Sequence, residues 1–303
     1  MNTQSTAMPE SFDSQRIAPE LAATQPLLWS VRRELWEYRS IYVAPLAVAA
    51  VTLFGFLIAT IGRAMSVPDP ARRAAVLTEP NDFAALLIMG TAFIVGGFYS
   101  LEALHGERRD RSILFWKSLP VSDLTTVLSK ASIPLVVLPL LSFALTVATQ
   151  WIMLLLSTAV LLESGLSVAP LWSHMPLFQT WLLLLYHLLT VHVLWYAPMY
   201  GWLLLVSGLA KRAAFLWAAL PWLAIGAVEK IAFNTTHFAA WVGYRFSGDA
   251  AGGSFMGDSG SMDPLMHLTP GKFLSTPGLW IGLAFFAACI AAAVRLRRYQ
   301  GPI

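Results

Sequence analysis

Charge is scarce in this 303-residue chain, and so is cysteine. Only 12% of the residues are charged, whereas soluble domains carry about 25%, and 57% are hydrophobic. A soluble fold cannot bury so much apolar surface, so lipid must be part of the solvent around this protein. The single cysteine, Cys289, excludes an internal disulfide, and its place in the last apolar run is typical of a small hydrophobic residue.

Several motifs are also missing. The chain has no Gly-x-x-x-x-Gly-Lys-Ser/Thr loop, so we expect it neither to bind nor to hydrolyse ATP. It has no Gly-x-Ser-x-Gly elbow of a serine hydrolase. Its basic residues stand at the ends of apolar runs and form no long cluster, which argues against nucleic-acid binding. Residues 1–26 lack the apolar core of a signal peptide, and their polar composition predicts a disordered cytoplasmic tail.

Long apolar runs, in contrast, are abundant. About 20 apolar residues in a helix cross the hydrocarbon core of a bilayer. The sequence therefore predicts an all-α integral membrane protein, with a transmembrane domain over residues 27–299. Its six predicted spans cover residues 41–61, 83–104, 133–156, 181–209, 213–232 and 278–294. Pro198 predicts a kink or tilt in the long fourth span.

The distribution of Lys and Arg predicts the orientation. With the N-terminus in the cytoplasm, 14 of the 20 basic residues fall on the cytoplasmic side. We therefore expect a multi-pass protein of the bacterial cytoplasmic (inner) membrane with both termini in the cytoplasm.

Two segments outside the spans are open to two interpretations each. Residues 27–40 have apolar residues at helical spacing with charges between them. This favours an amphipathic helix on the membrane surface over a simple extension of the first span. The outer connection, residues 233–277, is rich in Gly, Ser and Asp. It is either a flexible loop or a partly re-entrant cap over the exit of a pathway.

The segment between the second and third spans holds the densest charge. We expect Gly106 to end the second helix, a short helix over residues 107–117, and a cap at Ser122 for the next helix. Such a cytoplasmic coupling helix, joined by short turns to two spans, can act as a lever for a partner that opens and closes. Its charged face would contact the partner.

The order of residues in this segment resembles the permease subunits of the ABC-2 type transporter family. A Glu ends the second span, Gly-Glu-Arg and a Leu-Pro-Val-Ser turn follow, and a Lys opens the third span. In this chain these residues are Glu102, Gly106, Glu107, Arg108, Leu119, Pro120, Val121, Ser122 and Lys130. Arg111-Ser112 departs from the Gly-Thr that family members often carry after the charged run.

The resemblance implies a function and its partners. Such permeases pair, as two copies or with a sister permease, bind two copies of a separate cytoplasmic ATPase, and mostly export their substrate. It implies an ATPase-coupling role for the matched residues and for Arg111. ATP would be used by the partner, and this chain would bind no cofactor. An intramembrane enzyme and a non-transporting scaffold are the alternative interpretations.

A few polar residues in the spans are weaker candidates. His187 and His192 lie about 140° apart around a helix, so they do not form the i, i+4 pair of a metal site. Glu229 and Lys230 lie near the outer end of the fifth span. Because ionisable residues at membrane depth are functional candidates, Glu229, Lys230 and His187 are possible polar residues of a pathway.

Overall fold

The computed structural model describes residues 25–118, 121–173, 177–247 and 270–303, and these ranges are helical almost throughout. The predicted tail over residues 1–26 lies almost wholly outside them, as does most of the Gly-rich part of the outer connection. The elements in chain order are α1 (Gln25–Glu37), α2 (Ser40–Gly55), η1 (Phe56–Ile61), α3 (Gly62–Met65), α4 (Pro70–Glu102), α5 (His105–Arg109), α6 (Ile113–Lys117), α7 (Asp123–Ser132), η2 (Ile133–Val137), α8 (Leu138–Glu163), α9 (Ala169–Ser173), α10 (Leu177–His187), η3 (Leu188–Trp195), α11 (Ala197–Leu209), α12 (Ala214–Phe233), α13 (His237–Ser247), α14 (Pro270–Leu274) and α15 (Pro277–Tyr299).

Six helices in the described ranges are long and apolar enough to cross a membrane, which confirms the predicted all-helical, multi-pass character. They are Ser40–Ala64, Pro70–Arg109, Asp123–Glu163, Ala169–Trp195, Ala214–Phe233 and Pro277–Tyr299. The second and third begin well before the predicted apolar runs, because polar first turns extend both helices beyond their apolar stretches.

The predicted fourth span is interrupted. Its helix has π-helical geometry over η3, ends at Tyr196 and restarts as α11 with Pro198 in the first turn. A proline has no backbone N–H to donate and fits the first turn of a helix best. The expected kink is therefore a break between two helices.

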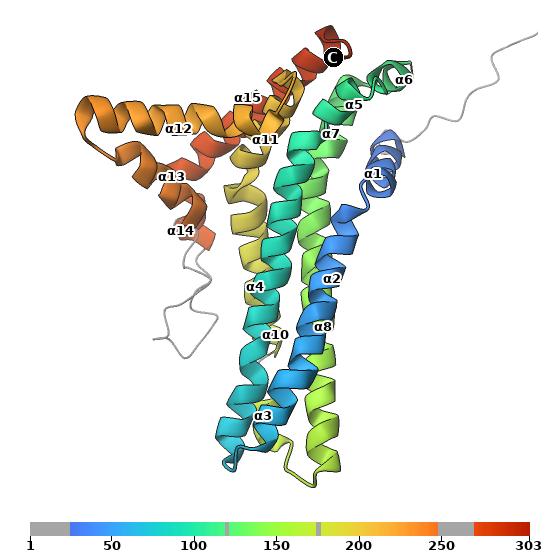
Figure 1. Cartoon of the computed structure of the whole chain (residues 1–303), viewed down its shortest axis with the longest axis vertical. Coiled ribbons are helices and arrows are strands. Elements are labelled where there is room, and N and C mark those ends of the chain that lie inside the picture. Colours follow the sequence, from blue (N-terminus) through green and yellow to red (C-terminus); the bar gives the residue numbers. More distant parts are fainter. Residues whose placement is uncertain (1–24, 119–120, 174–176, 248–269) are drawn as a thin grey trace, which may run out of the picture.

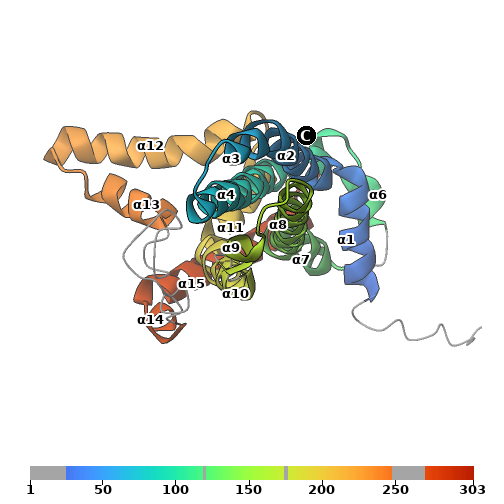
Figure 2. The ribbon, with the colours of Figure 1, turned by 90° about the horizontal axis from the view of Figure 1, so that it is seen from below.

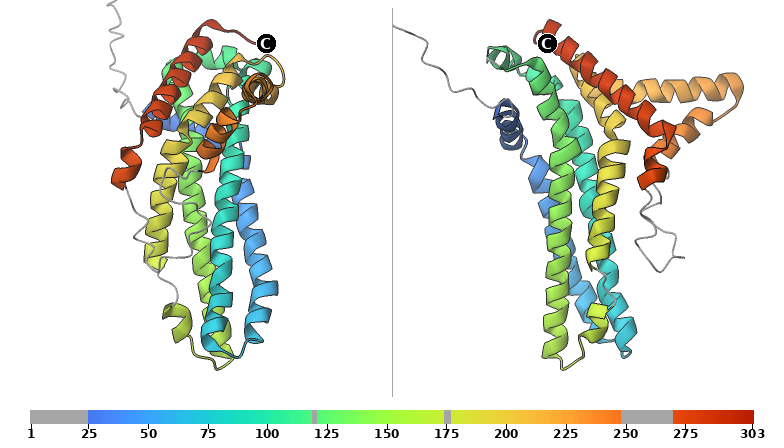
Figure 3. Two further views of the ribbon diagram at one scale, coloured as in Figure 1. Left: turned by 90° about the vertical axis from the view of Figure 1, so that its left-hand side faces the viewer. Right: turned by 180° about the vertical axis from the view of Figure 1, so that it is seen from behind.

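Four long helical segments lie side by side and form the body of the molecule (Figure 1). They are the segments α2–α3, α4, α7–α8 and α10–α11. We call the end that holds α5, α6 and the C-terminus the upper end, as in Figure 1. Helix α15 rises obliquely to this end and packs against α11 (Figure 3). Gly201 of α11 permits that contact, because a Cβ there would lie 2.6 Å from the Phe286 ring of α15.

The fifth candidate span does not run along the body. Helix α12 leaves the upper end and projects sideways from it (Figures 1 and 2). Little of it is buried within the chain, and large apolar side chains such as Trp217, Leu220 and Leu223 are exposed. Helix α12 thus runs across the direction of the body, and its apolar surface has almost no partner among the described residues of the chain.

The outer connection is partly helical. Helix α13 turns back from α12, with Phe238 and Trp241 stacked on Trp222 of α12. The Arg245 guanidinium at its far end lies 4.0 Å from the centre of the Trp195 ring of η3. Helices α13 and α14 lie beside the middle of the body, away from its lower end (Figures 1 and 3). The described residues of the connection are thus mostly helical, and a cap over the exit of a pathway stays a prediction.

Candidate functional site

Six charged side chains from four parts of the chain meet at the upper end. We call them the charged cluster: Arg33 and Glu34 of α1, Glu107 of α5, Asp123 and Lys130 of α7, and Arg297 of α15. The Lys130 ammonium donates to Glu34 Oε1 at 2.9 Å and to Glu107 Oε1 at 3.1 Å. The Arg297 guanidinium pairs with Glu107 Oε2 and, at 3.2 Å, with Asp123 Oδ1. Arg33 pairs with Glu34 and, at 3.1 Å, with Glu107.

The centre of the cluster is shielded from solvent. The side chains of Glu34, Glu107 and Lys130 are at most 1% exposed, and that of Arg297 is 4% exposed. A buried charge is tolerated only where it is paired and its hydrogen-bonding capacity is used. Three cations and three carboxylates pair with one another in this way, while Arg33 Nε has no hydrogen-bond partner among the described residues. The cluster therefore holds α1, α5, α7 and α15 in one arrangement, and loss of one member leaves the remaining buried charges unbalanced.

Three aromatic side chains lie next to the charged cluster. The Tyr99 hydroxyl of α4 donates to Glu34 Oε2 at 2.8 Å, and the Tyr38 ring meets Tyr99 edge to face. Where the cluster meets α6, the Arg33 guanidinium lies 3.9 Å from the centre of the Trp116 ring. These contacts extend the cluster to α4 and α6, so every element of the segment between the second and third spans touches it.

The two carboxylates of α1 differ in their electrostatics. Burial alone would raise the pKa of Glu34, but Lys130 and Arg33 outweigh it and hold the pKa below its ordinary value. Half-exposed Glu37, one turn later, has a raised pKa because of burial and of the nearby Glu34 charge. Glu34 is therefore the carboxylate of α1 that is fixed in its charged form.

The segment before α7 is built differently from our expectation. Helix α4 ends at Glu102, and Gly106 lies within α5, where a Cβ would come within 3.3 Å of the Tyr38 hydroxyl and 3.2 Å of the Glu102 carboxylate. The expected single helix over residues 107–117 is two short helices, α5 and α6. Arg111 separates them with a left-handed φ of 59°. The predicted cap is confirmed, since Ser122 accepts a hydrogen bond from the Thr125 N–H at 3.0 Å.

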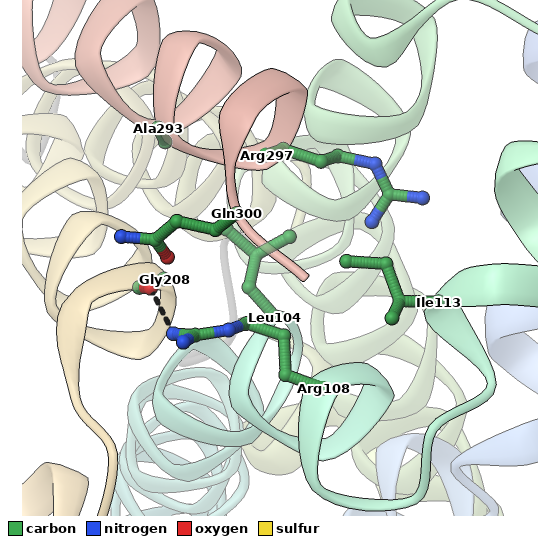
Figure 4. A pocket seen from close by; sticks show the side chains of 7 residues that line it. All are labelled: Leu104, Arg108, Ile113, Gly208, Ala293, Arg297 and Gln300. Carbon is green, nitrogen blue, oxygen red and sulfur yellow. Dashed lines mark hydrogen bonds between the residues drawn. The ribbon is translucent and has the colours of Figure 1, made fainter. Parts of the chain in front are cut away.

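The structure places two of the residues that were expected to couple to the ATPase inside the protein. The side chains of Glu107 and Arg108 point into the protein and are buried. Arg108 donates to the carbonyl oxygens of Gly208 and Gly301, and Ile303 N–H donates to the Arg108 carbonyl at 3.2 Å. Figure 4 shows Arg108 beside Gly208 in a small pocket between α5, α11 and α15. The pocket is lined by Leu104, Arg108, Ile113, Gly208, Ala293, Arg297 and Gln300.

Glu102 of the matched pattern and Arg111 are not members of the charged cluster. Glu102 pairs at the surface with Arg109 at 2.8 Å, and Arg111 is exposed. Leu119 and Pro120 lie outside the described residues. Among the residues of the pattern that the structure describes, only Glu107 and Lys130 belong to the cluster.

The possible pathway residues are scattered. The Glu229 carboxylate accepts hydrogen bonds from the Thr235 hydroxyl and from the N–H groups of His237 and Phe238, at 2.7–2.8 Å, so it caps the start of α13. Lys230 is exposed, and half-buried His187 has its Nδ1 3.1 Å from the Leu183 carbonyl of its own helix. The structure does not bring these three side chains together.

Sequence reasoning missed Arg33, Glu34, Asp123, Arg297 and Tyr99. One of them had a usable signal, because Glu34 lies on the apolar stripe of α1 that includes Val31, Leu35 and Tyr38. A carboxylate in such a stripe needs a buried cation. Arg297 had no comparable signal, since it stands among the basic residues expected beyond the last span.

Within the described ranges, no group of three or more His, Cys, Asp and Glu side chains is arranged to hold a metal ion. Comparisons of the chain with protein-family models, with curated proteins and with solved structures give no match.

Proposed function

We propose that this chain is the membrane-spanning permease subunit of an ABC-2 type transporter in the bacterial inner membrane. It forms the pathway as a pair, exports its substrate and is driven by a separate cytoplasmic ATPase. One observation supports the proposal most directly. Glu107 and Lys130, which the family resemblance singles out 23 positions apart, meet at 3.1 Å and together hold the first and last helices of the chain.

The charged cluster suits the transmission of force. Buried ion pairs resist separation, because pulling one partner away leaves the other unpaired in a poorly hydrated site. A push on α5 or α6 would therefore move α1, α7 and α15 together. Helix α7 continues through η2 into α8, and α5 follows α4 after two residues, so two candidate spans are joined directly to the moving part.

The contact surface for the ATPase is apolar in this proposal. Leu114 and Phe115 are about 60% exposed, and they belong to α6, which lies at the upper end (Figure 1). Around them lie the exposed charged groups Arg109, Asp110, Arg111 and Lys117. Exposed aromatic and aliphatic residues within a polar rim are typical of protein interfaces. Leu114 and Phe115 thus take the role that the sequence alone suggested for Glu107 and Arg108.

Copurification tests the proposal. The tagged chain, extracted from its native membrane in mild detergent, should bring down a protein that has a phosphate-binding P-loop and hydrolyses ATP. The double variant Leu114→Ser/Phe115→Ser should recover at least about tenfold less of it, because hot-spot residues cost about 2 kcal/mol or more each. Phe178→Ser, at an aromatic residue of α10 that is 76% exposed, is the control and should leave recovery unchanged. Copurification of no P-loop protein, or equal loss in both variants, would overturn the proposal.

A further inference from the structure

Helix α1 has two faces of opposite character. One face packs on the protein through Val31, Glu34, Leu35 and Tyr38. The other presents Trp29, Arg32 and Trp36 to the outside. At 100° per residue, an ideal helix places these three within a sector of about 60°, nearly opposite Glu34. Two large indoles on the outer face of a docked helix need a partner of their own.

The outer face is organised around one guanidinium. Arg32 lies 5.7 Å from the centre of the Trp29 ring and 5.2 Å from that of Trp36. The two tryptophans are 66% and 71% exposed. Within the described ranges no ion pair joins Arg32 to a carboxylate, whereas the adjacent Arg33 turns inward to Glu34 and Glu107. Stacking on an indole leaves the N–H edge of a guanidinium free for two parallel hydrogen bonds to a phosphate.

The position of α1 sets how deep in the membrane its outer face lies. The helix ends three residues before Ser40, where the first candidate span begins. Figure 2, which looks along the body, shows α1 lying across that direction at the edge of the molecule. A helix that lies crosswise at the start of a span is held at the level of the headgroups. Trp side chains favour this interface, because the ring is apolar and its N–H is polar.

We infer that Trp29, Arg32 and Trp36 form a binding site for the headgroup of an anionic phospholipid. The Arg32 guanidinium would bind the phosphate, and the two indoles would lie on either side of it among the upper acyl carbons. Exposed Arg39 adds a second positive charge next to the start of the span. The inference does not rest on the proposed function, since it needs only the N-terminal helix at the membrane surface.

Native mass spectrometry of the full chain in mild detergent tests the site. The protein is incubated with phosphatidylglycerol or, separately, with phosphatidylcholine, and the lipid retained per chain is measured. Arg32→Gln should retain phosphatidylglycerol about fivefold more weakly, the effect expected for one arginine at a charged membrane surface. Retention of phosphatidylcholine should fall less, because its own choline group already neutralises its phosphate. Trp29→Leu/Trp36→Leu should weaken retention of both lipids, because the indoles contact apolar carbons that both lipids share.

Arg212→Gln is the matched control, an exposed arginine at the start of the turn before α12. It should behave as the wild type. Unfolding temperatures measured without added lipid should agree among the wild type, Arg32→Gln and Arg212→Gln, which shows that the fold is intact. Equal retention of phosphatidylglycerol by the wild type and Arg32→Gln overturns the inference. So does a loss of the copurifying ATPase in Arg32→Gln with lipid retention intact, because the face would then be a protein contact.

Discussion

Lys130 reaches two carboxylates that come from different helices, and its ammonium group is out of contact with solvent. The neighbouring side chains explain why a charge can stay there. Glu34 also pairs with Arg33 and accepts a hydrogen bond from the Tyr99 hydroxyl. Glu107 also pairs with Arg33 and Arg297. Each carboxylate thus keeps other partners if Lys130 is lost, but the balance of charge is broken.

We expect Lys130→Met to destabilise the protein by about 3 to 5 kcal/mol, as for a buried ion pair that loses one partner. Methionine fills nearly the same space as lysine, so the loss of stability measures the effect of removing the charge. The measurement is thermal unfolding in detergent. Lys117→Met removes an exposed lysine at the same end of the molecule and should cost under about 1 kcal/mol. Similar unfolding temperatures for the two variants would show that the charged cluster adds little to stability.

Glu34 makes the stability of the folded protein depend on pH. Its pKa in the folded protein is below the ordinary value of 4.5, so its contribution to stability is complete above that pH. The contribution is lost as the pH falls below about 4.5 towards the folded pKa. Unfolding temperatures measured from neutral pH downwards should fall more steeply in the wild type than in Glu34→Gln. Parallel curves would contradict the prediction, and exposed Glu163→Gln provides the control.

At this scale the sequence singled out two of the six members of the charged cluster, without predicting that they touch. Glu107 and Lys130 stood in a recognisable pattern, but their partners come from α1 and α15, at the two ends of the chain. No local pattern states that position 34 meets position 130, because such a pairing depends on how the helices pack. Glu34 could have been predicted as buried from its place in the apolar stripe, without its partner being known.

At the scale of elements, apolar length predicted the helices well and their directions poorly. A run of 20 apolar residues sets the length of a helix that can cross a bilayer, and packing against neighbours sets its tilt. The break at Arg111 could not be predicted, because Gly and Asn are the residues typical of a left-handed φ. The break before α11 could be anticipated, because Pro198 marks it.

Close packing of α11 and α15 rests on a single glycine. Alanine at position 201 would place its Cβ 2.6 Å from the Phe286 ring and 3.4 Å from the Phe286 backbone. Overpacking of this kind costs about 1 to 3 kcal/mol, against a gain in helix propensity of at most about 1 kcal/mol. Gly201→Ala should therefore lower the unfolding temperature in detergent. Gly90→Ala, where a Cβ would meet nothing within 4 Å, should leave it unchanged or raise it. Equal effects of both substitutions would mean that α15 yields to the added methyl group.

At the scale of the whole molecule, much more of the apolar surface is buried within the chain in the body than in the projecting α12. The four long segments bury one another, whereas α12 exposes apolar residues on most of its circumference. In a membrane such a surface can face lipid or the helices of another chain. The proposed pairing of permeases gives it the second role, in which α12 of one copy packs against its partner.

Cysteine crosslinking distinguishes these two roles, and the chain is well suited to it because Cys289 is its single cysteine. In a Cys289→Ser background, cysteine introduced at Leu220 or Leu223 of α12 should form a disulfide between two copies when native membranes are oxidised. The physical reason is that a packed interface holds the same position of both copies close together, whereas lipid keeps them apart. Leu140 is about as exposed as Leu220 and belongs to α8, a helix of the body that lies away from α12 (Figure 1). Cysteine there is the matched control and should remain reduced. A disulfide to a different membrane protein of similar size would indicate a sister permease as the partner. Crosslinking at Leu140 alone, or at no position, would mean that α12 faces lipid and that the pair forms elsewhere or not at all.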